Sequence, residues 1–476
     1  MSLEEIQSEQ FLFYKDKDFT LYKGKMQDVL STFEENSIDS IVCDPPYELN
    51  FMSKGWDNQG IAFLKDTWEH CFRVLKEGGY LLAFGGTRTF HRIACAIEDA
   101  GFEIRDTIIW LYGSGFPKSM NIGLAIDKKK GVDNRTGNVV KGVGSNNTNS
   151  MKNGLGKSQE FAKEYEERIA QNEWKGWGTT LKPAYEPIIV ARKPFKGSLV
   201  DNILQNGVGG LNIDECRVGN EHFEIKNGDY DNNQNQRCFG NIKRTQKEYY
   251  GRFPSNVITD GSEEVAQGMP FTNGGSKIIT NKEVNGKGLT SENPVFNSNN
   301  CGFKTNIKND SISSYGDNGS AMRYFYCAKA NSKDRDEGLD DFESVKINLT
   351  QNGCNRKENG KSILENPNIS KKNVHPTVKP VELMQYLVRL VSPKGAKVLD
   401  CFMGSGSTGK ACMFENRERN ANYHFIGIEM TDEYLPIAKT RIDYAKYKYQ
   451  CDEIKEKEER KEKGIINIFD ILEEWN

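Results

Sequence analysis

Short apolar runs alternate along this chain with segments whose apolar residues recur every three or four positions. The run Ser40–Cys43 is apolar and β-branched, which is typical of a buried strand. Similar runs predict further strands at Tyr80–Phe84, Glu103–Tyr112, Ile188–Ala191, Lys397–Asp400 and His424–Glu429. Helical periodicity predicts helices at Phe63–Leu75, Thr87–Ala100, Pro380–Val391, Thr408–Phe414 and Thr431–Tyr449. Strands that alternate with helices predict an α/β fold with a Rossmann-like, doubly wound mixed sheet.

Between residues 195 and 324 this pattern breaks down. Asn and Gly are frequent there, apolar runs are short and helical periodicity disappears. Within the preceding part, Phe161–Trp174 is predicted as a charged helix and Asp127–Gly156 as a polar loop. We therefore expect a first half of the core at residues 10–194, an inserted irregular α+β domain at 195–324, a connecting segment at 325–372, the second half of the core at 373–449 and a charged helical tail at 450–476.

Composition narrows the class of protein. The chain has 476 residues and a net charge of −3, so overall charge does not indicate a nucleic-acid partner. Its 11 cysteines include no CxxC pair, which argues against a zinc site or a disulfide framework and predicts no bound metal. The first ten residues are too polar for a signal peptide, and no apolar run reaches the ~18 residues of a membrane span. We expect a cytoplasmic protein.

The first candidate site is Asp44-Pro45-Pro46-Tyr47, which directly follows the strand Ser40–Cys43. Open α/β sheets place their ligand sites at such carboxyl ends of strands. Two prolines offer no N–H and end the strand, leaving one carboxylate, bare carbonyl acceptors and one aromatic ring. This set suits a planar group with an amino substituent, which would stack on Tyr47 and donate to Asp44 and the Pro45 carbonyl. An ordinary turn with a core tyrosine explains the four residues equally well.

The second candidate site is the glycine-rich segment Val398–Ala411, whose pattern predicts a strand, a turn and the start of a helix. Gly404 and Gly406 allow a tight turn, and Ser407 and Thr408 could cap the helix. Glu429 ends the next strand, where an acid can hold both hydroxyls of a ribose.

This segment has two other interpretations. Residues 404–410 also fit the GxxxxGK phosphate loop of NTPases, although Ala411 replaces the Ser or Thr that would reach Mg²⁺. In a nicotinamide dehydrogenase Gly409 would be the third glycine of the cofactor loop. However, this chain lacks the catalytic residues expected elsewhere in such an enzyme.

Together these motifs resemble those of DNA amino-methyltransferases. DPPY and its surroundings, Ile38–Asp57, resemble phage-type members, and HPTVKP (residues 375–380) followed by DCFMGSGST resembles their cofactor half. DPPY precedes the glycine-rich loop, as in the permuted β group. The resemblance implies a methyltransferase fold with an inserted target-recognition domain. It also implies methyl transfer from S-adenosylmethionine to the amino group of adenine in double-stranded DNA, by base flipping and without a covalent enzyme intermediate.

The alternatives left open are transfer to the 4-amino group of cytosine, an inactive DNA-binding relative and, more remotely, the NTPase. The resemblance allows a homodimer, and it does not say whether a restriction nuclease is the partner of the chain. An Asp in the first place of DPPY goes with adenine in relatives, which favours adenine here.

The resemblance also implies roles for single residues. Relatives have Gly-Asp where this chain has Gly24-Lys25, so Asp28 either takes the place of that Asp at the cofactor or caps a helix. His375 either contacts the cofactor or is structural. Thr377 and Lys379 are expected near its methionine carboxylate. The implied cofactor-binding set is Asp400, Phe402, Gly404, Gly406, Ser407, Thr408, Glu429, Thr377, Lys379, His375 and Asp28.

Basic residues that alternate with aromatic ones lie in the inserted domain. They predict a DNA-binding surface, although a charge run is more often a solvated face. The place of this region between two catalytic halves, where relatives carry target recognition, favours DNA. The residues predicted to bind DNA are Lys243, Arg244, Lys247 and Arg252, with Lys54 in the loop after DPPY.

Overall fold

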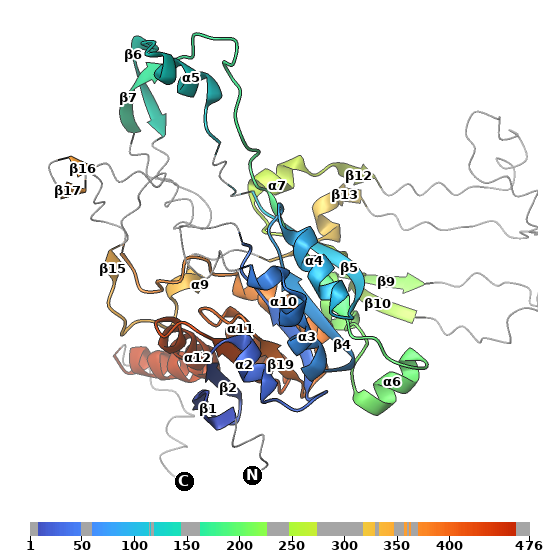
Figure 1. Cartoon of the computed structure of the whole chain (residues 1–476). Helices are drawn as coiled ribbons and strands as arrows, with labels where there is room; N and C mark the ends of the chain where they lie inside the picture. Colours follow the sequence, from blue (N-terminus) through green and yellow to red (C-terminus); the bar gives the residue numbers. More distant parts are fainter. Residues whose placement is uncertain are drawn as a thin grey trace, which may run out of the picture. The chain divides into compact units, whose positions relative to one another are not determined.

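The computed structural model describes residues 8–48, 60–113, 115, 119–143, 162–225, 247–273, 318–328, 333–346, 357–358, 361–362 and 370–462. The chain divides into two compact units (Figure 1). The first comprises residues 1–216, 256–265 and 327–476, and the second comprises residues 217–255 and 266–326.

The first unit is built on a ten-stranded sheet of order β1-β2-β20-β19-β3-β4-β8-β5-β11-β14. The pairs from β2 to β4 and the pair β5–β11 are parallel, whereas β8 runs antiparallel to both of its neighbours. In chain order the strands are β1 Leu12–Lys15, β2 Phe19–Lys23, β3 Ile38–Cys43, β4 Leu75–Phe84, β5 Glu103–Leu111, β8 Tyr185–Arg192, β11 Val257–Thr259, β14 Tyr326–Cys327, β19 Lys397–Asp400 and β20 His424–Glu429. The predicted doubly wound mixed sheet is confirmed.

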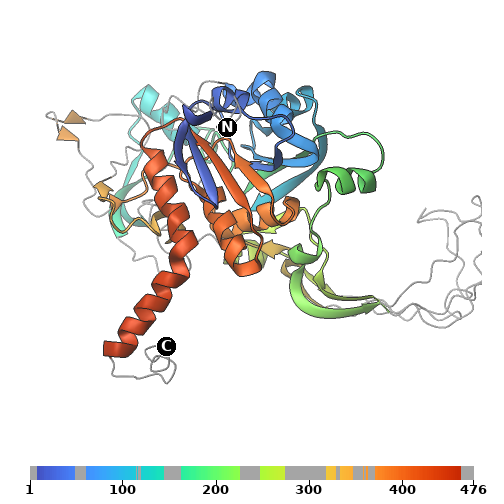
Figure 2. The ribbon, with the colours of Figure 1, turned by 90° about the horizontal axis from the view of Figure 1, so that it is seen from below.

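Two groups of helices cover the faces of this sheet (Figure 2). One group packs around Trp68 and comprises α2 Met26–Ser31, α3 Lys65–Val74 and α4 Phe90–Asp99. The other comprises α10 Val381–Val391, α11 Ser407–Arg419 and α12 Tyr434–Glu462. A buried ion pair joins α10 to α11, with the Arg389 guanidinium 2.6 and 3.0 Å from the Glu415 carboxylate. Among the described residues no helix is both long and apolar enough to cross a membrane.

The order of strands brings distant parts of the chain together. Strand β3 pairs with β19 in parallel, with Ser40 opposite Val398 and Ile41 opposite Leu399. Their carboxyl ends therefore meet at one edge of the sheet, although more than 350 residues separate them in sequence. The chain continues from β3 toward α3 in one helix group and from β19 into α11 in the other. Such a switch point is where open α/β sheets bind ligands.

Two predictions of local structure are wrong. The segment Phe161–Trp174 is not a helix, because it contains β7 (Ala162–Arg168), which pairs antiparallel with β6 (Arg135–Val143). A partner strand that satisfies the backbone overrides helix propensity, which is a weak determinant. The polar segment Asp127–Gly156 accordingly contains the end of α5 (Ile122–Lys130) and all of β6.

Helical periodicity also does not vanish directly after residue 195. Helix α6 (Leu199–Asn206) begins where the Ser198 hydroxyl accepts a hydrogen bond from the Asp201 N–H, and it ends at Gly207 in the left-handed conformation. Its eight residues pack against β4. The prediction failed because an amphipathic helix of only about two turns is hard to recognise among so many Asn and Gly residues.

The second unit consists of short strand pairs. Strand β9 (Val218–Ile225) pairs with β10 (Lys247–Arg252), and β12 (Phe271–Asn273) pairs with β13 (Asn318–Ser320). The remaining elements of the chain are η3 Ile61–Phe63, η4 Asp214–Cys216, α7 Glu263–Gly268, η6 Ala321–Tyr324, α9 Lys333–Asp336, β15 Val345–Lys346, β16 Lys357–Glu358, β17 Lys361–Ser362 and β18 Ser370–Lys371.

Candidate active site

The tetrapeptide Asp44–Tyr47 leaves β3 at the edge that β3 shares with β19. Strand β3 is buried along its whole length, so its end is fixed by the core. The Tyr47 carbonyl accepts a hydrogen bond of 2.8 Å from the Thr89 hydroxyl at the start of α4. The Tyr47 hydroxyl donates to Glu186 Oε2 over 2.9 Å. The half-buried ring of Tyr47 is thus held at both its backbone and its hydroxyl end.

A buried lysine joins this corner from the second half of the chain. Lys379 Nζ lies 2.7 Å from Asp44 Oδ2, 3.1 Å from the Tyr47 hydroxyl and 3.3 Å from Glu186 Oε2. It also lies 4.8 Å from the centre of the Phe84 ring. The Lys379 side chain is only 9% exposed, so both ion pairs are largely shielded from solvent. Its ammonium group thus binds Asp44, and its expected place near the cofactor's carboxylate stays a prediction.

One oxygen of the Asp44 carboxylate has no hydrogen-bond donor among the described residues, and we call it the open oxygen. Oδ2 is bound to Lys379, but the buried Oδ1 has no hydrogen-bond partner among the described residues. A buried acceptor without a donor costs about 1–3 kcal/mol, so this atom marks a place for a ligand that donates an N–H or O–H. Pro45 follows Asp44 in the chain and has a carbonyl that can act as a second acceptor, and neither Pro45 nor Pro46 has an N–H to offer.

Burial and ion pairing shape the protonation of the cluster. Burial, together with the Asp44 and Glu186 carboxylates, raises the pKa of Tyr47 well above its ordinary value, so the phenol stays neutral. Burial alone would lower the pKa of Lys379, but the same two carboxylates outweigh it and raise that pKa. Lys379 is therefore a permanent cation at neutral pH.

The glycine-rich turn after β19 faces this corner from the neighbouring strand. Gly404 and Gly406 have φ of +54° and +78°, which side chains rarely adopt. A Cβ at Gly404 would lie 2.8 Å from His375 Nε2, and one at Gly406 would lie 3.0 Å from the Ala438 Cβ. Both glycines are thus needed for conformation and for space.

The predicted helix caps after this turn are wrong. Helix α11 begins at Ser407 with Gly406 as N-cap and without a side-chain cap. Thr408 lies inside the first turn and donates instead to Asp400 Oδ2 over 2.5 Å. Gly406 occupies the N-cap position, so Ser407 and Thr408 are already helical residues and neither caps the helix.

Two carboxylates border the turn. Glu429 ends β20, and its oxygens accept from the Gly404 N–H at 2.9 Å and the Thr431 N–H at 2.7 Å. Hydrogen bonds from the Thr431 side chain and the Met430 backbone also favour its charged form. Asp400 ends β19 and accepts from the Phe402 N–H at 3.1 Å. Burial raises the pKa of Glu429 and, more strongly, that of Asp400.

Lys410 tests the interpretation of this loop as a phosphate loop. Its side chain is fully buried, and Nζ lies 2.7 Å from Glu337 Oε2 and 5.4 Å from the centre of the Tyr444 ring on α12. In a phosphate loop this lysine reaches the phosphates beside the backbone N–H groups. Here its ammonium group is bound to Glu337, which argues against an NTPase.

Comparison with known proteins agrees with this geometry. A model of the N6/N4 DNA methylase family matches residues 38–440, a span that contains both strand ends. The chain belongs to this DNA methylase family.

Curated relatives of this DNA methylase include M.HindIII of Haemophilus influenzae, a type II methyltransferase that is 23% identical over 263 residues (53% of this chain, 68% of the relative). The type II methyltransferase M.BglI of Bacillus subtilis is 36% identical over 92 residues (19% and 25%). The DNA adenine methyltransferase YhdJ of Escherichia coli is 36% identical over 87 residues (18% and 27%). The last two alignments thus span about a quarter of each relative's length.

Solved structures similar to the DNA methylase include the cytosine-N4-specific PvuII DNA methyltransferase. It has a TM-score of 0.37 and 13% identity, covering 90% of this chain and 87% of that chain. The M1.HpyAVI–SAM complex has a TM-score of 0.32 and 14% identity, covering 89% of this chain and 98% of that chain.

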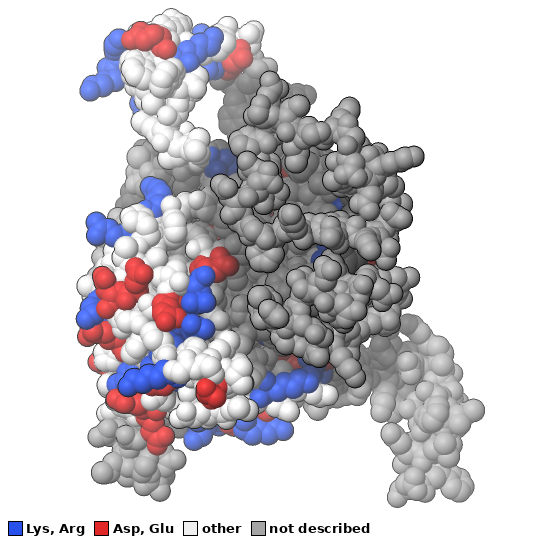
Figure 3. Space-filling view, turned by 90° about the vertical axis from the view of Figure 1, so that its right-hand side faces the viewer, with Lys and Arg blue, Asp and Glu red and all other residues white. Residues whose placement is uncertain are grey.

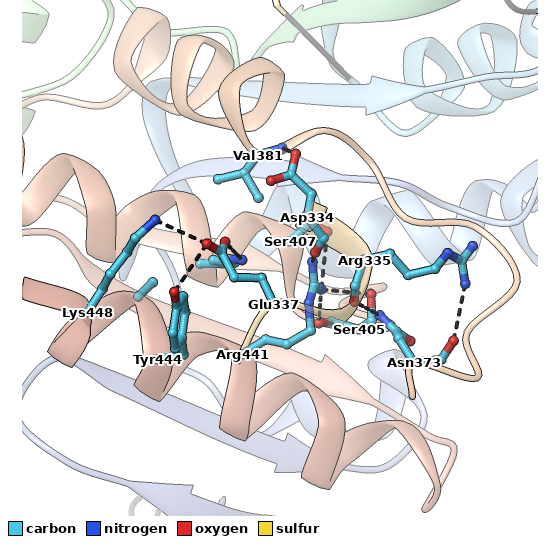
Figure 4. A network of polar contacts seen from close by, with 12 residues as sticks. Asp334, Arg335, Glu337, Asn373, Val381, Ser405, Ser407, Arg441, Tyr444 and Lys448 are labelled. Atoms are coloured by element: carbon cyan, nitrogen blue, oxygen red, sulfur yellow. Dashed lines mark hydrogen bonds and ion pairs between the residues drawn. The ribbon is translucent and has the colours of Figure 1, made fainter. Parts of the chain in front are cut away.

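The segment HPTVKP of the methylase is tied to the glycine-rich turn by a network of arginines (Figure 4). Arg335 donates to the carbonyls of Asn373, His375 and Pro376 at 3.2, 2.6 and 2.8 Å. The fully buried Arg441 donates to the Ser405 carbonyl and hydroxyl and, over 2.8 Å, to the Asp334 carbonyl. The segment around α9, predicted only as a connection, therefore fixes both motifs.

His375 lies directly against the glycine-rich turn. One ring nitrogen contacts the Thr377 carbonyl, and the ring meets Tyr434 edge to face with centroids 4.6 Å apart. Burial lowers the pKa of His375 to about 4, so the imidazole is neutral at physiological pH. Thr377 is exposed and contributes its carbonyl to this contact. Phe402 packs on the core, with its ring 6.2 Å from that of Trp68.

The remaining predicted residues differ in how much the structure says of them. Asp28 is exposed in the first turn of α2 and does not cap this helix, because Lys25 is the N-cap and no side chain caps it; the charge of Asp28 only suits the helix dipole. Lys54, Lys243 and Arg244 lie outside the described residues, and only the backbone of Lys247 is described. Arg252 belongs to β10 and lies 2.8 Å from Glu221 of the same unit. On the described part of the face shown in Figure 3, basic and acidic residues are interspersed.

Glu186 is the residue of this site that sequence reasoning missed. It precedes the apolar centre of β8 and matches none of the motifs considered. Its only sequence signal is an acid at the end of a buried strand, two residues before the run Ile188–Ala191.

Proposed function

We propose that this DNA methylase transfers a methyl group from S-adenosylmethionine to the exocyclic amino group of adenine, at specific sites in double-stranded DNA. The observation that carries the proposal is the open Asp44 Oδ1, a buried acceptor at the strand edge shared with the glycine-rich turn. An amino group has two N–H bonds, and Asp44 Oδ1 and the Pro45 carbonyl can accept one each.

These acceptors address the chemical difficulty of the reaction. The lone pair of an adenine amino group is delocalised into the ring, so the nitrogen is a poor nucleophile. Two hydrogen bonds to fixed acceptors favour a more tetrahedral nitrogen, whose lone pair then points at the electrophile. Asp44 is held in place by Lys379 and Tyr47 by Glu186, so the acceptors and the stacking ring are preorganised before the base arrives.

The residues around the glycine-rich turn fit the methyl donor. Glu429 ends β20 beside the turn, where an acid can bind the hydroxyls of a ribose, and the glycines at 404 and 406 let a ligand approach the backbone. Asp400 places a second carboxyl group at the turn, with Phe402 and His375 beside it. When bound, S-adenosylmethionine supplies a methyl group on a positively charged sulfur as the electrophile.

The DNA must present its target to this edge of the sheet. An amino group inside a duplex cannot reach Asp44, so the proposal requires the base to rotate out of the helix and stack on Tyr47. We assign the chemistry to residues 10–194 and 373–449 and the recognition of sequence to residues 195–324, joined by 325–372 and followed by the tail 450–476. Lys54, Lys243, Arg244, Lys247 and Arg252 are the proposed phosphate and base contacts.

The choice of adenine rests on two supports. Asp44 holds the first place of DPPY, and one relative is named a DNA adenine methyltransferase.

Analysis of the methylated nucleoside tests the proposal. The purified chain should transfer a labelled methyl group from S-adenosylmethionine to plasmid DNA, and digestion of that DNA should yield labelled N6-methyldeoxyadenosine. Labelled N4-methyldeoxycytidine would overturn the assignment to adenine. No label in any of several DNA substrates, with the donor bound, would overturn the proposed activity.

A further inference from the structure

Glu186 links the two catalytic halves although it belongs to neither motif. It lies near the start of β8, opposite Trp110 of β5. One oxygen, Oε2, accepts from the Tyr47 hydroxyl at 2.9 Å and lies 3.3 Å from Lys379 Nζ. The Glu186 side chain is 22% exposed and that of Asp44 is 23% exposed, so both carboxylates border the open part of the site.

The charges of this cluster do not cancel. Asp44 and Glu186 contribute two negative charges, and Lys379 contributes one positive charge. The cluster therefore carries one net negative charge. Without Glu186, Lys379 would neutralise Asp44 and the net charge would be zero. The tyrosines nearby, Tyr47 and Tyr112, have raised pKa values and add no charge.

The proposed reaction brings positive charge to this place. As the N–CH₃ bond forms and the S–CH₃ bond breaks, the bonding electron pair stays on sulfur and the positive charge passes to the target nitrogen. That nitrogen then loses one proton, which the open Asp44 Oδ1 can accept. A partly buried site of net negative charge stabilises such a cation more than a neutral site does.

We propose that Glu186 is a positioning residue that fixes Tyr47 and Lys379 and keeps the site at one net negative charge during methyl transfer. This inference rests on the proposed function, so its test begins with a wild-type chain that labels DNA. If wild type does not label DNA, the proposed function fails; the inference about Glu186 is judged by its variants relative to an active wild type.

The first variant is Glu186→Gln, which removes the charge but keeps an oxygen that can accept from the Tyr47 hydroxyl. We expect the single-turnover rate of transfer to fall at least tenfold, with donor affinity in calorimetry within threefold of wild type. The matched control is Glu103→Gln, because Glu103 lies on neighbouring β5, is 43% exposed and pairs with Arg192 at 2.7 Å outside the site. The control should transfer methyl groups at the wild-type rate.

The second variant separates charge from shape. Adding Lys379→Met to Glu186→Gln restores one net negative charge, because Asp44 is then the only charged member of the cluster. We expect the double variant to be at least fivefold faster than Glu186→Gln alone. A Glu186→Gln chain with the wild-type rate would overturn the proposal. A slow single variant that loses donor binding, or one that the second substitution does not accelerate, would equally overturn it, because Glu186 would then be only structural.

Discussion

Replacing Gly404 by alanine tests the glycine-rich turn, and the structure gives the size of the effect. Gly404 has φ of +54°, and a left-handed conformation costs a residue with a side chain about 1–2 kcal/mol. The new Cβ would also lie 2.8 Å from His375 Nε2 and 3.1 Å from its Cε1. The His375 ring cannot retreat easily, because Tyr434 packs against it at 4.6 Å. Overpacking of this kind costs about 1–3 kcal/mol, so the variant should lose about 2–5 kcal/mol of unfolding free energy.

Gly395 offers a matched control. Its φ is +79°, yet no atom lies within 4 Å of where its Cβ would be. Gly395→Ala should therefore lose only the backbone part, about 1–2 kcal/mol. Denaturant unfolding measures both losses, and calorimetry measures S-adenosylmethionine affinity. We expect at least tenfold weaker donor binding in Gly404→Ala and unchanged binding in Gly395→Ala. Wild-type donor affinity in Gly404→Ala would refute the assignment of the donor to this turn.

Two further predictions concern pH. Burial raises the pKa of Asp400 well above its ordinary value, so the folded chain favours the neutral acid. The stability that Asp400 contributes is therefore fully present below its pKa in the unfolded chain and is lost as pH rises through its pKa in the folded chain. Asp400→Asn should therefore gain thermal stability relative to wild type as pH rises from 4 to 8, while binding the donor more weakly in calorimetry; equal pH dependence of the two chains would contradict this. His375 has its pKa lowered from 6.5 to about 4, so its contribution is complete above the unfolded pKa and is lost as pH falls toward 4. His375→Gln should lose less stability than wild type between pH 6.5 and 4, and a parallel loss in thermal scans would show that this histidine is not held neutral.

Much of the catalytic sheet was predictable because its central strands are buried on both faces. Strands β19 and β20 have the predicted bounds, Lys397–Asp400 and His424–Glu429, since continuous apolar runs leave little freedom in placing them. The segment that forms β7 misled the prediction, because its alternating charges fit a helix and only the pairing with β6 makes it a strand.

The chemistry of the strand end was predictable only in part. The motif marks Asp44 and Tyr47 as functional, but their partners come from residues 139 to 335 positions away in the sequence. Glu186 meets them because the sheet places β3, β4 and β8 in that order, and Lys379 meets them because it precedes α10, which packs against β3 and β4. A pattern within one segment cannot show such a contact, so an acid at the start of a buried strand was too weak a signal to reveal the role of Glu186.

The most direct test of the account is methyl transfer by Asp44→Ala, compared with wild type under single-turnover conditions. Asp44 Oδ1 is the acceptor without a partner among the described residues on which the assignment depends, and Asp44 follows β3 whereas the glycine-rich turn follows β19. We expect the rate of transfer to DNA to fall at least tenfold, because a hydrogen bond to a charged group is worth ~1.5–3 kcal/mol. Calorimetry should show S-adenosylmethionine affinity within about threefold of wild type. Turnover near the wild-type rate in Asp44→Ala would contradict the account.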